Sequence, residues 1–334
     1  MSDKVSLTLA DVARRARVSE STVSRVLRNK HPIAEETRAR VLEIVRQMGY
    51  TRNRVAGSLA SAGSDLVGVI LPALSNSVFA DVLRGIHDAL VPFGYQPVVG
   101  VTDYDRDTEE QLVGSLLSWK PAAMIVTGLV HSDYTVSMLR QSGVRIAEIM
   151  EVDSPPLDVA VGMSQRRAGY DTARHLVARG YRRFGYIGYN HQRDHRGALR
   201  YEGLKQGLSE AGLSLIGESI ANVPSSAQSG RSQLAALLDG HPELDAVVFS
   251  NDDMAVGGVF HCFAAGIKLR EQLAVFGFNA LDVGQALPLP LSTIRTPRFL
   301  IGKTAVQKIL ESPQRPASPT VIDTGYEIIV GATA

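Results

Sequence analysis

Two different patterns of apolar residues divide the chain near residue 65. Residues 7–48 place apolar side chains three and four positions apart, which is the spacing of short amphipathic helices. Three helices are predicted, with apolar faces formed by Val12, Ala13 and Ala16, by Val23, Val26 and Leu27, and by Val41, Leu42, Val45 and Met48. Thr8, followed by Asp11, suits the start of the first helix, Ser19 suits the start of the second, and Gly49 ends the third.

The pattern beyond residue 65 differs, because short apolar runs alternate there with amphipathic stretches. The predicted strands are 66–71, 96–101, 124–127, 146–149, 184–187, 246–249 and 273–276, and helical stretches between them include 78–90, 109–119, 167–178 and 254–265. This alternation predicts an α/β fold of parallel sheets with helices on both faces. The rhythm occurs over about 65–160 and again over 161–290, so we expect two doubly wound subdomains, with the C-terminal segment crossing back.

Charge is divided at the same point as the apolar pattern. The chain holds 35 basic and 34 acidic residues, a net charge of +1. Residues 1–64 hold 12 basic and 6 acidic residues, which leaves 23 and 28 for the remainder and gives net charges of +6 and −5. A basic head on an acidic body is expected of a DNA-binding unit attached to a sensor, although a basic helical surface without a partner has the same charge.

Several classes of protein are disfavoured by what the sequence lacks. A single cysteine, Cys262, cannot form an internal disulfide and fits a reducing cytosol. The first residues lack the apolar run of an export signal, and no apolar stretch is long enough to span a membrane, so we expect a cytoplasmic protein. Nucleophile-elbow, Walker, dinucleotide and zinc-ligand motifs are absent, and His191 and His195 lack a third ligand. We therefore expect no enzyme, catalytic residue, metal or cofactor.

The second predicted helix carries side chains suited to reading DNA. With its apolar residues buried, helical spacing exposes Glu20, Ser21, Ser24, Arg25 and Arg28. Hydroxyls bind phosphates, and an arginine can donate two hydrogen bonds to the O6 and N7 atoms of guanine. A helix that enters the major groove by its N-terminal end is the helix-turn-helix geometry. The alternatives are a phosphate or solvent contact for Arg25 and repulsion of phosphate by Glu20.

The sequence resembles the lactose-repressor (LacI) family over essentially its whole length. The motifs are Leu-Ala-Asp-Val-Ala at 9–13, Val-Ser-x-x-Thr-Val-Ser-Arg-Val-Leu at 18–27, Gly-Tyr-x-x-Asn-Arg-x-Ala-x-x-Leu at 49–59, Gly-Val-Ile-Leu-Pro at 68–72, Val-Phe-Ala-Asp-Val-Leu-Arg-Gly-Ile at 78–86, Ser-Asn-Asp-Asp-Met-Ala-Val-Gly at 250–257 and Val-Phe-Gly-Phe-Asn at 275–279. The resemblance implies a three-helix helix-turn-helix domain (1–49), a hinge (50–64), and a periplasmic-binding-protein-like body (65–334) that binds an effector and dimerises.

The family resemblance also implies what the head does. It implies a homodimeric repressor that binds pseudo-palindromic operator DNA and responds allosterically to a sugar-type effector. The resemblance implies that Glu20, Ser21 and Arg25 contact the DNA bases. It also implies a hinge that folds on the operator and inserts Leu59 into the minor groove. The predicted DNA-binding residues are Ser19, Glu20, Ser21, Thr22, Ser24, Arg25, Arg28, Asn53, Arg54 and Leu59.

Polar and aromatic residues near the ends of the predicted strands are candidates for the effector site, because ligands of such sheets bind beyond the carboxyl ends of the strands. The candidates are Ser77, Phe79, Asp103, Tyr104, Thr127, Ser164, Arg196, Arg200, Asn251, Asp252 and Asn279. Amides and carboxylates bond sugar hydroxyls, an aromatic ring packs on a C–H face, and an arginine fork binds a carboxylate. By position, Arg200, Asn251 and Asn279 match the family's effector contacts. The alternatives are core packing for Phe79, helix capping for Asn251 and Asp252, and solvation for Arg196.

Two further features bear on the effector. Asn279 and Ser164 stand where many relatives of the family have aspartate, which favours an anionic ligand. Segments 83–86, 117–119 and 154–162 resemble the gluconate-utilisation branch, which implies gluconate, a ketogluconate or a related sugar acid. A regulator of a neutral sugar or another small metabolite, and a sugar-binding protein without a DNA partner, are the alternatives.

Overall fold

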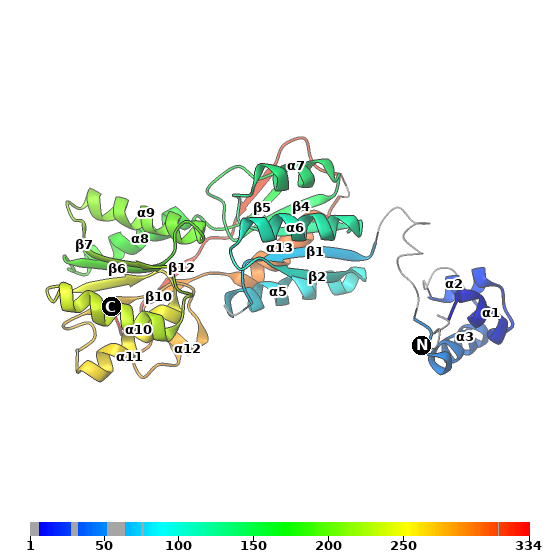
Figure 1. Cartoon of the computed structure of the whole chain (residues 1–334), viewed down its shortest axis with the longest axis horizontal. Coiled ribbons are helices and arrows are strands. Elements are labelled where there is room, and N and C mark those ends of the chain that lie inside the picture. The colour runs from blue at the N-terminus through cyan, green and yellow to red at the C-terminus, as the bar shows by residue number, and fades with distance from the viewer. Residues whose placement is uncertain (1–6, 28–32, 52–63, 75–76, 313) are drawn as a thin grey trace. The chain divides into compact units, whose positions relative to one another are not determined.

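The computed structural model describes residues 7–27, 33–51, 64–74, 77–312 and 314–334 (Figure 1). The chain divides into two compact units, Met1–Ser64 and Asp65–Ala334. No helix among these residues is both long and apolar enough to cross a membrane.

The described part of the first unit forms the three predicted helices, α1 (Leu9–Ala16), α2 (Glu20–Leu27) and α3 (Glu35–Met48). Their shared core includes the fully buried residues Val12, Ala16, Val23 and Val41. The predicted helix ends are confirmed. The Thr8 side chain accepts from the Asp11 amide and the Asp11 carboxylate accepts from the Thr8 amide, Ser19 Oγ accepts from the Thr22 amide at 3.2 Å, and Gly49 ends α3 with a φ of 63°.

The first sheet of the second unit is parallel, with strand order β11-β5-β4-β3-β1-β2. Its strands are β1 (Leu66–Leu71), β2 (Gln96–Val101), β3 (Ala123–Thr127), β4 (Arg145–Ile149), β5 (Val159–Gly162) and β11 (Thr320–Asp323). Helices α5 (Ser77–Leu90) and α13 (Arg298–Leu310) cover one face, and α6 (Arg106–Ser118) and α7 (Asp133–Gln141) cover the other. Along β1, Val69 and Leu71 face the first pair of helices and Ile70 faces the second pair, so buried residues continue on both faces.

The second sheet repeats this architecture with strand order β7-β6-β8-β9. Its strands are β6 (Phe184–Tyr189), β7 (Leu215–Ala221), β8 (Ala246–Phe249) and β9 (Ala274–Phe276). One face packs against α8 (Gln165–Ala178) and α9 (His195–Glu210), and the other packs against α10 (Ala227–Gly240) and α11 (Asp252–Ala265), as Figure 1 shows. Val248 faces the first pair of helices and Phe249 the second. The predicted α/β class with two doubly wound subdomains is confirmed.

The chain passes between the two subdomains at three places among the described residues. It leaves the first sheet after β5, returns to it from β10 (Thr293–Arg295) through α13, and leaves again after β11 for β12 (Glu327–Ile329), which pairs with β10. Two short elements complete the body, η1 (Val91–Phe93) and α12 (Asp282–Gln285). The first subdomain is therefore assembled from two distant stretches of sequence.

Five strands of the structure lie outside the predicted set, namely β5, β7, β10, β11 and β12. Four of them, β5, β10, β11 and β12, have only three or four residues, and β7 and β11 are edge strands with many exposed residues. Neither kind produces a long apolar run. Of the predicted strands, 66–71, 96–101 and 246–249 have the observed bounds, and the others differ by one or two residues at an end.

Candidate functional site

Helix α2 presents its predicted polar face to the surface of the head. Val23 and Val26 are buried, whereas Glu20, Ser21 and Arg25 are exposed. Thr22 and Ser24 are half-buried, and Ser19 is exposed at the helix start. The predicted residues Arg28, Asn53, Arg54 and Leu59 lie outside the described residues.

Hydroxyl groups gather at the N-terminus of α2. Ser19 Oγ lies 2.8 Å from Ser21 Oγ and 2.9 Å from Thr22 Oγ1. Arg25 lies one turn further along, with its Nε donating to the Ser21 carbonyl at 3.3 Å. The amides and hydroxyls at this helix start suit a phosphate, and the same helix presents an arginine able to reach a base edge.

A cavity of about 560 Å³ lies in the second unit and takes its lining from both subdomains. Seven predicted effector residues line it, namely Phe79, Asp103, Tyr104, Arg196, Arg200, Asn251 and Asn279. The structure thus brings together residues separated by as many as 200 positions in the sequence, because the strand ends of both sheets face the same space.

Four predicted effector residues do not line this cavity. Thr127 Oγ1 donates to the Ile70 carbonyl at 2.9 Å, and Ser164 caps α8 while its hydroxyl donates to Asp153 at 2.5 Å. Asp252 is fully buried and accepts hydrogen bonds inside the protein. Ser77 is exposed at the first position of α5. Each side chain has a local structural role or points elsewhere, so its place at a strand or helix end is not sufficient to make it a cavity residue.

The structure adds polar cavity residues that the sequence did not single out, namely Gln165, Tyr189, Arg193, Asp194, Ser225, Ser226 and Asp253. Asp194 accepts from the Gly197 amide at 3.1 Å as the N-cap of α9. Aspartate is a preferred N-cap residue, so the sequence contained a signal for this position. Asp253, rather than the neighbouring Asp252, lines the cavity.

Three helices direct their N-termini at the cavity. Their cap residues, Asp194 of α9, Ser226 of α10 and Asn251 of α11, all belong to its lining. Asn251 combines both roles that its sequence position allowed, because its Oδ1 caps α11 through the Met254 amide and the residue also lines the cavity. Helix N-termini carry partial positive charge, so this arrangement favours an anionic ligand.

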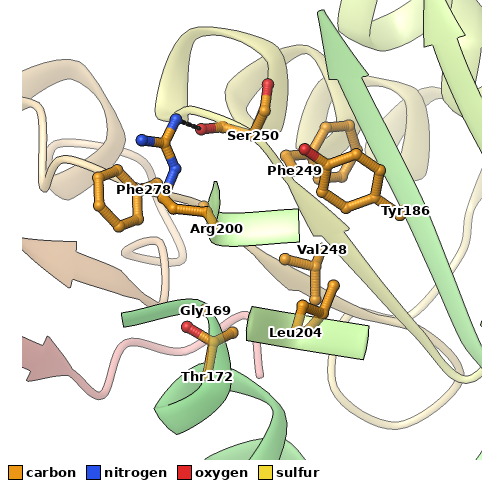
Figure 2. A pocket seen from close by; sticks show the side chains of 10 residues that line it. Gly169, Thr172, Tyr186, Arg200, Leu204, Val248, Phe249, Ser250 and Phe278 are labelled. Atoms are coloured by element: carbon orange, nitrogen blue, oxygen red, sulfur yellow. Dashed lines mark hydrogen bonds between the residues drawn. The ribbon is translucent and has the colours of Figure 1, made fainter. Parts of the chain in front are cut away.

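Arg200 lies at the wall of the cavity, and Figure 2 shows its guanidinium above the ring of Phe278. Its central carbon is 4.1 Å from the ring centroid. Nη1 donates to Gln165 Oε1 at 2.6 Å, and Nη2 donates to the Ser250 carbonyl at 3.1 Å. Burial lowers the pKa of Arg200, and the nearby Asp194 carboxylate, whose Oδ2 is 3.8 Å away, opposes this shift. The side chain is a cation that is only 13% exposed, and these contacts hold it in one orientation.

A second, small cavity lies on the inner side of Arg200 and is drawn in Figure 2. Its volume is about 20 Å³, and Thr172, Tyr186 and Leu204 are among the residues that line it. Arg200 Nε is buried without a hydrogen-bond partner among the described residues. A cavity of this size has room for one water molecule.

Aromatic residues and Asn279 complete the large cavity. The rings of Tyr104 and Tyr189 meet edge to face with centroids 6.0 Å apart, and burial raises the pKa of Tyr104 to about 12. Asn279 has a φ of 116°, and its carbonyl accepts from Arg298, which also donates to Asp81 Oδ2 at 2.8 Å. Arg298 thereby joins the Asn279 loop to helix α5.

Three buried acids, Glu109, Glu148 and Glu151, lie in the first subdomain. Glu151 is fully buried, and neither carboxylate oxygen has a hydrogen-bond partner among the described residues. Burial raises the pKa of Glu151 to about 7, although the charge of Arg196 opposes the shift. Burial alone would lower the pKa of His131, but its contacts with Glu109 at 2.8 Å and Glu148 at 3.5 Å raise that pKa to about 9. No group of three or more acidic, histidine or cysteine side chains in the described parts of the chain could hold a metal ion.

Comparison with known families matches both units. Residues 8–53 match the family described as bacterial regulatory proteins, lacI family. Residues 64–324 match the family described as periplasmic binding proteins and sugar binding domain of LacI family.

Individual relatives cover nearly the whole chain. The HTH-type transcriptional regulator GntR of Pseudomonas aeruginosa is 39% identical over 324 residues, which are 96% of this chain and 94% of that protein. The regulator of the same name from Escherichia coli K12 is 33% identical over 97% of this chain and 98% of its own length. A solved transcriptional regulator of the LacI family from Silicibacter pomeroyi is 40% identical, covers 98% of this chain and 99% of its own, and superposes with a TM-score of 0.92.

Proposed function

The chain belongs to the LacI family of bacterial regulatory proteins, and from that membership and the cavity geometry we propose that it is a transcription repressor whose operator affinity is controlled by a sugar acid. Gluconate and ketogluconate are the effectors we propose first. The family's members are DNA-binding regulators, so the chain acts in the cytoplasm, where bacterial DNA lies.

The observation that carries the sugar-acid proposal is the hydrogen bonding of the Arg200 guanidinium at the cavity wall. An arginine side chain has five N–H donors, and the contacts with Gln165 and Ser250 use one on each terminal nitrogen. Each terminal nitrogen retains one N–H outside these two hydrogen bonds, and the nearest anion, Asp194 Oδ2, lies 3.8 Å from Nη2, beyond hydrogen-bond distance. Because a buried cation gains from a nearby anion, a carboxylate at this position is favoured over a neutral hydroxyl. Asp103 and Asp253 line the same cavity and supply acceptors for the hydroxyls of a polyol chain.

The head supports the proposed DNA contact. The exposed face of α2 combines Glu20 and Ser21 at the helix N-terminus, the end by which a helix-turn-helix protein meets base edges, with Arg25 one turn further along. This arrangement supports direct reading by Arg25 and phosphate contacts by the serine hydroxyls.

A homodimer is supported by exposed apolar residues on the body. Phe260 and Phe263 of α11 are 44% and 43% exposed, and Val283 of the neighbouring α12 is 50% exposed. Clusters of exposed large apolar side chains mark protein interfaces. A two-fold dimer through this surface presents two heads to the half-sites of a pseudo-palindromic operator.

The proposed allosteric control follows from linkage. A sugar acid that binds one arrangement of the two subdomains better than another shifts the population toward that arrangement. Typical coupling free energies correspond to a change of roughly 5–150-fold in operator affinity.

The test combines calorimetry with operator binding. Gluconate or 2-ketogluconate should bind and change operator affinity, and glucose at the same concentration should do neither. Arg200→Ala should abolish both effects, whereas Arg167→Ala, which removes an exposed arginine of α8, should leave both unchanged. If glucose binds best, the effector is a neutral sugar. If Arg200→Ala responds like the wild type, Arg200 does not hold the effector.

A further inference from the structure

Gln165 occupies the point where the chain enters the second subdomain. It is the first residue of α8, and its side chain is buried. Its Oε1 accepts from Arg200 Nη1 at 2.6 Å, and its Nε2 donates to the Met150 carbonyl at 2.6 Å. One amide group therefore joins the proposed effector anchor to the strand end of the other subdomain.

Chemistry fixes the orientation of this amide. A guanidinium can only donate hydrogen bonds, so the oxygen of Gln165 must face Arg200. A carbonyl oxygen can only accept, so the nitrogen must face Met150. Glutamate at this position cannot donate to Met150, and asparagine is shorter by one carbon. Glutamine supplies both bonds at this span.

The Met150 end of this contact is itself tightly held. Met150 follows β4, lines the large cavity and has a φ of 77°, a left-handed conformation that favours glycine. Its amide donates to the Val161 carbonyl at 2.9 Å. The backbone N–H of Gln165 also donates to Asp153 Oδ2 at 2.7 Å. Residues 150–153 are therefore attached to the start of α8 at both ends, through Met150 and through Asp153.

We propose that Gln165 is a positioning residue that couples Arg200 to the first subdomain. It aims the remaining N–H donors of Arg200 at the cavity, and a ligand that draws the guanidinium away removes the donor from Gln165 Oε1. The amide then shifts, and residues 150–153 shift with it. This inference rests on the proposed role of Arg200 as the effector anchor, and it adds the path by which an occupied cavity acts on the other subdomain.

The first experiment needs no effector. Hydrogen–deuterium exchange is measured over peptides covering residues 147–155 in the wild type, Gln165→Met, Arg200→Ala and the double variant. Each single variant should increase exchange there, because each removes one end of the contact, and the double variant should add little. Gln233→Met, which alters a half-buried glutamine of α10, should leave this segment unchanged. Wild-type exchange in Arg200→Ala, or fully additive increases, would overturn the proposal.

The second experiment separates ligand binding from response. Gln165→Met keeps the approximate length of the side chain and loses both hydrogen bonds, whereas Gln165→Glu keeps the acceptor for Arg200 and loses the donor to Met150. With gluconate as the probe, the ligand-dependent change in operator affinity should fall below twofold in both variants at saturation. Gln165→Glu should also bind gluconate more weakly than Gln165→Met, because the new carboxylate neutralises Arg200.

A wild-type response in either variant would show that the Met150 contact carries no coupling. If the wild type binds no sugar acid, the proposed effector is wrong, and the exchange experiment still decides the role of Gln165. Should Gln165→Met fail to fold, as judged by its thermal transition, Gln165→Glu and Arg200→Ala provide the same exchange comparison.

Discussion

Thr293 Oγ1 donates a hydrogen bond of 2.7 Å to Asp252 Oδ1, and both side chains are fully buried. The other oxygen of Asp252 accepts from the Leu281 amide at 2.7 Å. Asp252 therefore fastens the start of α11 to β10 and to the loop that carries Asn279. The neighbouring residue, Asp253, lines the cavity instead. Two adjacent aspartates thus have different roles.

Replacing these aspartates should separate stability from ligand binding. Asp252→Ala leaves two buried donors without an acceptor and should lower the free energy of unfolding by about 2–4 kcal/mol. Asp253→Ala should lower it by less than about 1 kcal/mol and weaken sugar-acid binding. Urea unfolding and calorimetry on both variants measure the two effects. Equal destabilisation by the two changes would contradict the structural role of Asp252 and the cavity role of Asp253.

Glu151 should make stability depend on pH. Its pKa is raised to about 7 in the folded protein, so the folded state binds a proton more tightly than the unfolded state between its ordinary value of 4.5 and 7. The sign follows directly, because stability from this group is greatest at low pH and is lost as the pH rises through that window. Glu151→Gln mimics the protonated form. It should therefore reduce the loss of unfolding free energy between pH 4.5 and 7 by about 1–3 kcal/mol.

The measurement is the free energy of unfolding in urea at several pH values from 4.5 to 7. Glu311→Gln, in an exposed pair with Lys308, serves as the control and should retain the wild-type slope. An unchanged slope in Glu151→Gln would mean that the acid is satisfied in the folded state.

Arg25→Ala should weaken operator binding by about 1–3 kcal/mol and relax the preference at one base of each half-site, if the side chain reads a guanine. Fluorescence anisotropy on operator, on operators with single-base changes and on random duplexes measures this. Arg231→Ala removes the same charge from the exposed surface of the body and should have little effect. An equal loss on operator and random DNA would reduce Arg25 to a phosphate contact.

Phe260→Asp combined with Phe263→Asp should dissociate the proposed homodimer, because two charges would be buried in an apolar interface. Analytical ultracentrifugation should then show a monomer with wild-type secondary structure and weaker operator binding. Trp119→Asp, which alters an aromatic residue that is 55% exposed at the end of α6, should leave the dimer intact. A dimer that survives the double change would place the interface elsewhere.

The sequence predicts local structure well wherever the pattern is continuous. Thr8, Ser19 and Gly49 mark helix ends by chemistry that acts within four residues, and the structure confirms all three. Strands such as β1 are buried on both faces and appear as unbroken apolar runs. By contrast, β11 becomes a strand through pairing with β5, more than 150 residues away, and its mostly exposed residues carry no comparable pattern.

Prediction of the cavity residues from sequence is limited in the same way, because distant contacts decide which residues line it. Arg200 and Asn251 follow from family motifs, but Gln165 belongs to the cavity only because the chain crosses between subdomains beside β4. Asp252 and Asp253 are identical in type and adjacent in sequence. Their different roles follow from the rotation of α11, which turns one side chain toward β10 and leaves the other at the cavity.

The first subdomain is assembled from two distant stretches of sequence, so it is completed late in synthesis. The head has its own core within residues 9–50, so it can fold once it leaves the ribosome. The first sheet lacks α13 and its edge strand β11 until residue 323 has been made. At about 5–20 residues per second, that interval lasts roughly 14–55 seconds. A nascent chain thus carries a folded head well before it has the complete cavity in which we propose that the effector binds.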